Sequence, residues 1–118
     1  MNKRRIGTQY EELAASYLVA HGYQILEQNY RNSYGEIDII AMKNQWIVYV
    51  EIKYRANNQC GDPLEAVDIR KQKQICRVAR VHYARNYAME EKACRFDVIG
   101  IYGDGTIRQV ENAFLFQN

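Results

Sequence analysis

The stretch GEIDIIAMKNQWIVYVEIKY, at residues 35–54, decides how this chain folds. It contains two runs rich in β-branched residues, at 35–42 and 46–54, separated by the short polar segment Lys43-Asn44-Gln45. Two such runs joined by a short polar turn are typical of a β-hairpin. We therefore expect two antiparallel strands here, with successive side chains on opposite faces of the sheet.

Charged side chains interrupt both apolar runs of this hairpin. Asp38 lies in the first run, and Glu51 and Lys53 lie two residues apart in the second. Alternation puts Glu51 and Lys53 on one face, and a suitable register brings Asp38 beside them, because paired strands lie about 4.8 Å apart. Buried charges are costly unless they are paired or bind a metal ion. The two carboxylates therefore predict a site for Mg²⁺ or Mn²⁺, formed by Asp38 and Glu51.

This site has a specific chemical interpretation. A divalent cation held by Asp38 and Glu51 would polarise a phosphate oxygen and lower the pKa of an attacking water. Lys53 would position that water or stabilise the charge that develops on the phosphate. The Glu-x-Lys spacing is not specific, however, because Glu90 and Lys92 repeat it in a polar stretch. Residue type and spacing alone therefore favour the simpler interpretation of Glu51 and Lys53 as a salt-bridged, partly exposed strand face.

The rest of the chain carries alternating helical and strand patterns. Residues 62–65 (Asp-Pro-Leu-Glu) have the form of a helix start, and Asp68 offers a second N-cap from which the same helix could restart. The resulting order is α-β-β-β-α-β-β, which predicts an α/β protein of the α+β type with a mixed sheet. The predicted elements are a helix at 9–21 ended by Gly22, strands at 23–30, 95–102 and 107–110, a polar loop at 57–61, and a helix from residue 62 to about 87.

Length and composition indicate a single-domain protein without a membrane span, a signal peptide or a zinc motif. A chain of 118 residues suits one domain, 1–118, and no apolar run is long enough for a transmembrane helix. The basic N-terminal residues 1–5 are not followed by the apolar core of a signal peptide, so we expect a cytoplasmic protein without membrane association. We interpret Cys60, Cys76 and Cys94 as free thiols, because their spacing matches no zinc motif.

The predicted second helix carries a stripe of positive charge. Its members recur at i, i+3, i+7 and i+10, and no acidic residue occurs between Arg70 and Asn86. Such a stripe attracts a phosphate backbone, although a solvated helix face is an equally good interpretation. Arg31 and Arg55 flank the hairpin and are candidate contacts for the same ligand, whereas we interpret the ten tyrosines mainly as packing residues. The stripe, which we call the basic stripe, consists of Arg70, Lys73, Arg77 and Arg80, with Lys71 beside it.

Motifs along nearly the whole chain resemble, in the same order, those of the bacterial YraN family. The motifs are Gly7-xxx-Glu11-xx-Ala14, Gly35-Glu36-Ile37-Asp38-Ile39-Ile40-Ala41, Val50-Glu51-Ile52-Lys53-x-Arg55, Arg95-Phe96-Asp97-Val98 and Asn112-Ala113-Phe114. That family is similar in turn to the PD-(D/E)xK nuclease superfamily, and especially to archaeal Holliday junction resolvases.

The resemblance implies a restriction-endonuclease-like core and a set of site residues. Asp38, Glu51 and Lys53 take the positions of the nuclease signature, and Glu11 takes that of the acidic residue on the first helix. Glu36, one pleat before Asp38, either supports the site or caps the strand. The resemblance further implies a Mg²⁺- or Mn²⁺-dependent endonuclease that acts on DNA in preference to RNA, with branched DNA as a candidate substrate and a homodimer as a candidate assembly.

Two other functions are compatible with the same residues. The first is a nucleic-acid-binding module that keeps the fold without cutting. The second is a protein-interaction adaptor that presents the basic stripe to an acidic partner. Retention of all four of Glu11, Asp38, Glu51 and Lys53 favours the enzyme, because a module that only binds has no need of them.

Overall fold

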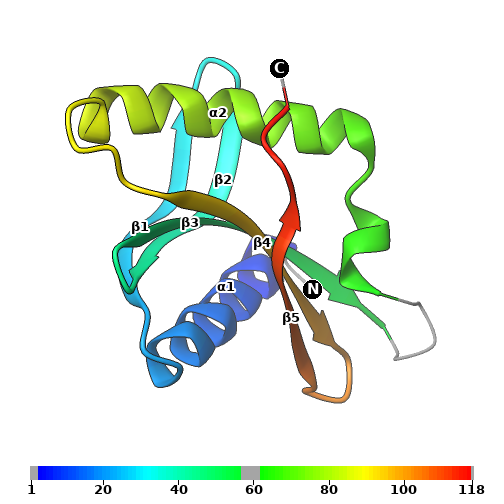
Figure 1. Ribbon diagram of the computed structural model, residues 1–118. Coiled ribbons are helices and arrows are strands. Elements are labelled where there is room, and N and C mark those ends of the chain that lie inside the picture. Colours follow the sequence, from blue (N-terminus) through cyan, green and yellow to red (C-terminus); the bar gives the residue numbers. More distant parts are fainter. Residues whose placement is uncertain (1–2, 57–61, 118) are drawn as a thin grey trace.

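The computed structural model describes residues 3–56 and 62–117, and within them the elements follow the predicted order (Figure 1). A short 3₁₀-helix, η2, precedes the second α-helix. No helix in the described ranges is long and apolar enough to cross a membrane. The elements are α1 (Lys3–Ala20), β1 (Gln24–Asn32), β2 (Gly35–Lys43), β3 (Trp46–Arg55), η2 (Pro63–Ala66), α2 (Ile69–Tyr87), β4 (Cys94–Tyr102) and β5 (Ile107–Phe114).

The strands form one five-stranded mixed sheet in the order β1-β2-β3-β4-β5. Neighbouring strands are antiparallel except for β3 and β4, which run parallel and are joined by the crossover through α2. The two α-helices lie on opposite faces of the sheet (Figure 1). Ala14 and Leu18 of α1 pack on the face that carries Val50, and Val78 of α2 packs on the face that carries Tyr49. The predicted α+β class is confirmed.

The predicted hairpin is confirmed as β2 and β3. Its ladder runs from the pair Lys43–Trp46 to the pair Ile39–Val50. Beyond Ile39 the alternation of β2 breaks, because Ile37 packs in the cluster under α2 whereas Ile39 packs in the cluster under α1. A strand of regular pleat would put these two side chains on the same face. The side chains of β2 therefore switch from one face of the sheet to the other at Asp38, where β2 separates from β3.

The structure refines several predicted boundaries. Asp68 begins a separate helix, since its carboxylate accepts a hydrogen bond from Lys71 N at 2.8 Å, and the residues before it form η2. The first helix begins at Lys3, earlier than predicted, because residues 3–8 carry little apolar periodicity. Strand β5 extends past the predicted end to Phe114. Cys76 and Cys94 are free thiols, as predicted, whereas Cys60 and the predicted loop at 57–61 lie outside the described residues.

A buried carboxylate holds the end of β5 against β4. Asp97 is 1% exposed and accepts hydrogen bonds from Arg95 Nε at 3.0 Å, Gln109 Nε2 at 2.8 Å and Asn112 N at 3.0 Å. Opposite Asp97 the ladder shifts register, and Asn112 adopts a positive φ of 50°. A buried charge is tolerated when its hydrogen bonds are satisfied in this way. The Arg-Phe-Asp-Val and Asn-Ala-Phe motifs thus have a structural role.

Candidate active site

Asp38 lies where strands β2 and β3 separate. Its Oδ2 accepts a hydrogen bond from the backbone N–H of Ile52 at 2.8 Å. Ile52 stands between Glu51 and Lys53, so this bond fixes the Asp38 carboxylate beside the Glu-x-Lys segment of β3. The predicted proximity of Asp38 to Glu51 is therefore present in the structure. A side-chain hydrogen bond joins the two strands just beyond the last pair of the backbone ladder.

Glu51 is the more buried of the two predicted ligands, with 7% of its surface exposed. Its Oε1 lies 3.7 Å from Lys53 Nζ and 3.9 Å from Lys71 Nζ. Lys53 comes from the same strand face, as predicted, and Lys71 reaches the carboxylate from the first turn of α2. Glu51 is thus a buried carboxylate with two ammonium groups close by, and one of them belongs to the helix that carries the basic stripe.

Both carboxylates hold their protons more tightly than usual. Burial is the main cause that raises the pKa of Asp38 to about 6, the Ile52 hydrogen bond opposes it, and the charge of Glu11 adds to it. Burial also raises the pKa of Glu51 to about 7, followed by repulsion from Asp38, while Lys71 and Lys53 act in the opposite direction. The two groups therefore repel each other in a partly dry environment, and a bound cation would relieve that repulsion.

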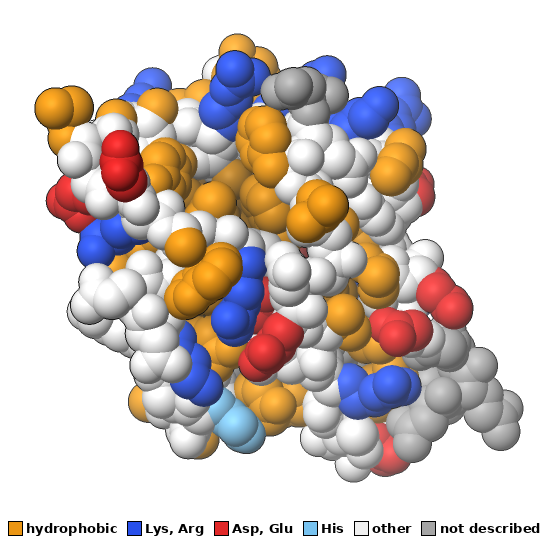
Figure 2. Space-filling view, in the orientation of Figure 1, with side chains coloured by type: hydrophobic (Ala, Val, Ile, Leu, Met, Phe, Trp, Pro, Cys, Tyr) orange, Lys and Arg blue, Asp and Glu red, His pale blue; other side chains and the backbone are white. Residues whose placement is uncertain are grey.

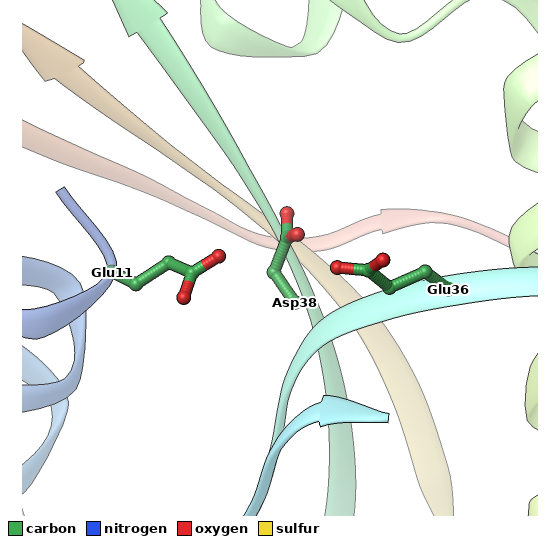
Figure 3. A group of neighbouring side chains, drawn as sticks. All are labelled: Glu11, Glu36 and Asp38. Atoms are coloured by element: carbon green, nitrogen blue, oxygen red, sulfur yellow. The ribbon is translucent and has the colours of Figure 1, made fainter. Parts of the chain in front are cut away.

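Three carboxylates converge at this end of the sheet, and we call Glu11, Glu36 and Asp38 the acidic group (Figure 3). One carboxylate oxygen from each lies within 4.8 Å of the others. Glu11 projects from α1, whereas Glu36 and Asp38 project from β2. Asn29 Nδ2 donates a hydrogen bond to Glu11 Oε2 at 2.8 Å, which holds that side chain in place.

The chemistry of these donors fits a hard divalent cation. Carboxylate oxygens from separate elements, partly buried and mutually repelling, are the ligands that Mg²⁺ and Mn²⁺ prefer. The structure groups these carboxylates differently from the predicted Asp38–Glu51 pair. Asp38 lies with Glu11 and Glu36, whereas Glu51 lies near two lysines. The sequence left the role of Glu36 open, although Glu36 lies on the same strand as Asp38, and it did not connect Lys71 with Glu51.

The basic stripe is present on the outer surface of α2. Its four members are all exposed, and Lys and Arg side chains line the upper edge of the molecule over this helix (Figure 2). Lys71 is turned toward Glu51 instead. Arg31 Nη2 lies 2.6 Å from Glu36 Oε2, so Arg31 forms an ion pair with a member of the acidic group. Arg55 is half-buried, and its Nε has no hydrogen-bond partner among the described residues.

Comparison with known proteins identifies relatives along most of the chain. The model of the family described as "Uncharacterised protein family UPF0102" matches residues 10–101. A UPF0102 protein of Lachnoclostridium phytofermentans is 46% identical, over 97% of this chain and 96% of the relative. UPF0102 proteins of Fusobacterium nucleatum and Vibrio parahaemolyticus are 44% and 41% identical, over 88% and 95% of this chain and 87% and 93% of the relatives. The chain therefore belongs to the UPF0102 family, which is the YraN family that its motifs resemble.

Proposed function

We propose that this protein is a metal-dependent nuclease that hydrolyses phosphodiester bonds in nucleic acid, with branched DNA as the first substrate to test. One observation carries the proposal: the buried Glu51 carboxylate and the Asp38 carboxylate repel each other beside Lys53. The charges of two such carboxylates cost the fold stability, so a cation and a substrate best explain their presence.

Each residue of the proposed site has a separate task. Asp38, oriented by the Ile52 N–H, and its neighbours in the acidic group would hold Mg²⁺ or Mn²⁺, with Glu51 as a further ligand. The ion would supply Lewis-acid stabilisation of the phosphate and a water of lowered pKa. Lys53 Nζ would donate a hydrogen bond to the phosphate oxygen on which charge accumulates, and Lys71 would hold Glu51 in its ionised form.

The cell location and the assembly belong to the same proposal. We place the protein in the cytoplasm, where nucleic-acid substrates are found. We take a homodimer as the assembly to test, since only the resemblance of the family to archaeal resolvases suggests it.

A cleavage screen tests the proposed function. Purified protein is incubated with branched, flapped and single-stranded DNA in Mg²⁺ and in Mn²⁺, beside Asp38→Asn prepared in parallel. Cleavage by the wild type that Asp38→Asn abolishes is the expected result. Cleavage of equal rate in both preparations would assign the activity to a contaminant or to another site.

A second candidate function is a nucleic-acid-binding module that does not cut. The observation in its favour is the exposure of all four members of the basic stripe, which need no acidic site to attract phosphates. Binding without cleavage of any substrate in the same screen would select this module.

A further inference from the structure

Tyr34 lines two neighbouring hollows on the α2 side of the molecule. It lies in the turn between β1 and β2, and its surface is 53% exposed. No aromatic ring of the described residues packs on it. One hollow, of about 440 Å³, is lined by Tyr34, Asp68, Arg70, Lys71, Gln74 and Arg77. The other, of about 380 Å³, is lined by Tyr34, Arg77, Arg80, Val81 and Ala84.

The turn that carries this ring is firmly attached to α2. Tyr34 N donates to Asn32 Oδ1 at 2.9 Å, and Gln74 Nε2 donates to Tyr34 O at 3.2 Å. Asn32 Nδ2 also donates to Val78 O at 3.2 Å, which ties the end of β1 to the same helix. Gly35 follows with a φ of +145°, and a Cβ there would meet Gln74 Nε2 at 2.8 Å. The ring therefore projects from a fixed support, although nothing in the core requires an aromatic side chain at this exposed position.

The surroundings of the ring are positively charged. Arg70, Arg77 and Arg80 are exposed along the two hollows, and the acidic Asp68 is engaged as the N-cap of α2. Lys71 lines the first hollow and also reaches Glu51, so the hollows lead from the basic stripe to the proposed site. A phosphate backbone laid along these arginines would therefore pass Tyr34, and Lys71 connects the same groove with Glu51.

An exposed ring in a basic groove fits one kind of nucleic acid. In a duplex the faces of the bases are covered by their neighbours, whereas an unpaired base leaves its face free to stack on an aromatic side chain. We propose that Tyr34 is a stacking platform for an unpaired base, so that this groove binds single-stranded segments in preference to duplex. The inference rests on the proposed function, because it specifies the substrate of the same site.

Tyr54 provides a contrast on the chain itself. It is 45% exposed and follows Lys53, but the ring of Tyr10 stacks on it at a centroid distance of 4.4 Å. One of its faces is therefore already covered by the protein. Tyr34, whose neighbours are cations, is the better placed of the two to receive a base.

Binding measurements test the inference without depending on cleavage. The affinities of wild type, Tyr34→Ala and Tyr34→Phe for an oligothymidylate of about ten nucleotides and for a short blunt-ended duplex are measured by fluorescence anisotropy in EDTA. Tyr34→Ala should weaken binding of the single strand about 5- to 150-fold and change duplex binding less than about twofold, because stacking contributes roughly 1–3 kcal/mol per base. Tyr34→Phe keeps the ring and should retain the single-strand affinity. Trp46→Ala, which removes an exposed aromatic residue at the start of β3, is the matched control and should leave both affinities unchanged.

The outcomes separate this inference from the proposed function. Equal losses for single strand and duplex, an unchanged single-strand affinity in Tyr34→Ala, or no binding of either oligonucleotide would each overturn the stacking platform. The cleavage screen decides the nuclease independently, so a protein that binds through Tyr34 but never cuts would refute only the proposed chemistry.

Discussion

The Asp38 carboxylate and the backbone N–H of Ile52 form a 2.8 Å hydrogen bond just beyond the last pair of the β2–β3 ladder. The side chain replaces the backbone acceptor that the ladder would have supplied had β2 stayed alongside β3. Asp38 therefore holds the two strands together and is also a member of the acidic group. Asparagine at this position keeps an acceptor for Ile52 and removes the charge, so it separates the two roles.

The first prediction concerns divalent metal binding. Wild-type protein should bind Mn²⁺ in calorimetric titration, and Asp38→Asn should abolish that binding while the thermal unfolding transition remains cooperative, because the Ile52 hydrogen bond keeps an acceptor. Glu90→Gln, in the turn after α2, is the control and should bind Mn²⁺ as the wild type does. Equal affinity in wild type and Asp38→Asn would remove Asp38 from the ligands.

The second prediction concerns the pH dependence of stability in the metal-free protein. The folded-state pKa of Glu51 is raised to about 7, above its unfolded value of about 4.5, so between these values the folded state binds more protons than the unfolded state. The free energy of unfolding contributed by Glu51 should therefore rise as the pH falls through this window. Glu51→Gln should be more stable than wild type at pH 8, by on the order of 3 kcal/mol, and the difference should shrink toward zero as the pH falls to 4.5.

Urea unfolding of both proteins at several pH values measures this difference. Glu90→Gln, with an exposed side chain, should follow the wild-type curve throughout. A Glu51→Gln protein that is less stable than wild type at pH 8 would show that Lys53 and Lys71 outweigh burial, contrary to the raised pKa.

The third prediction concerns the salt dependence of nucleic-acid binding. Changing Arg70, Lys73 and Arg77 together to Gln should weaken binding and flatten the plot of log affinity against log salt, because fewer counterions are released. Arg108→Gln, at an exposed site on β5, is the control and should leave the slope nearly unchanged. If the triple variant keeps the wild-type slope, the binding surface lies elsewhere.

The fourth prediction concerns the chemical step. Lys53→Met should lower the cleavage rate on the order of a hundredfold or more while substrate affinity changes little, because the ammonium group acts on charge that grows in the transition state. Single-turnover kinetics and equilibrium binding separate these two effects. Lys92→Met alters the other Glu-x-Lys segment, whose lysine contacts Glu90 and Gln45, and should cut normally. Wild-type rates in Lys53→Met would mean that another group carries the reaction.

The fifth prediction concerns stability alone. Asp97→Ala should lower the free energy of unfolding by about 3–5 kcal/mol, because it leaves Arg95 and the donors from β5 without their buried acceptor. Urea denaturation measures the loss. Glu111→Gln removes an exposed carboxylate from the rim of the same network and should change stability by less than about 1 kcal/mol. Similar losses in both variants would show that burial of Asp97 is not the decisive feature.

The hairpin and its charged residues could be predicted because their signals are local. Period-2 alternation placed Glu51 and Lys53 on one face. The hairpin ladder ends at Ile39, next to Asp38, whose carboxylate accepts a hydrogen bond from Ile52 N and so lies close to Glu51. These inferences need only a short stretch of chain and the geometry of one element.

Contacts between distant elements could not be predicted in the same way. The pairing of Lys71 with Glu51 depends on where α2 lies over the sheet, which no spacing within α2 encodes. The hydrogen bonds of Asp97 depend on a register shift in β5, and the predicted strand ended before it. Likewise, Leu13 in the predicted helix at 9–21 is exposed, because Ala14 and Leu18 face the sheet.

The parallel pairing of β3 with β4 also determines the order in which this protein can fold. The hairpin joins residues close in sequence, whereas Ile47 meets Cys94 only after the whole α2 crossover has been made. During synthesis β3 therefore emerges as an apolar strand, Trp-Ile-Val-Tyr-Val, with an open edge that waits for its partner. Such an edge can pair with other chains, so the long crossover that brings Lys71 to Glu51 also leaves the nascent chain open to aggregation until β4 is released from the ribosome.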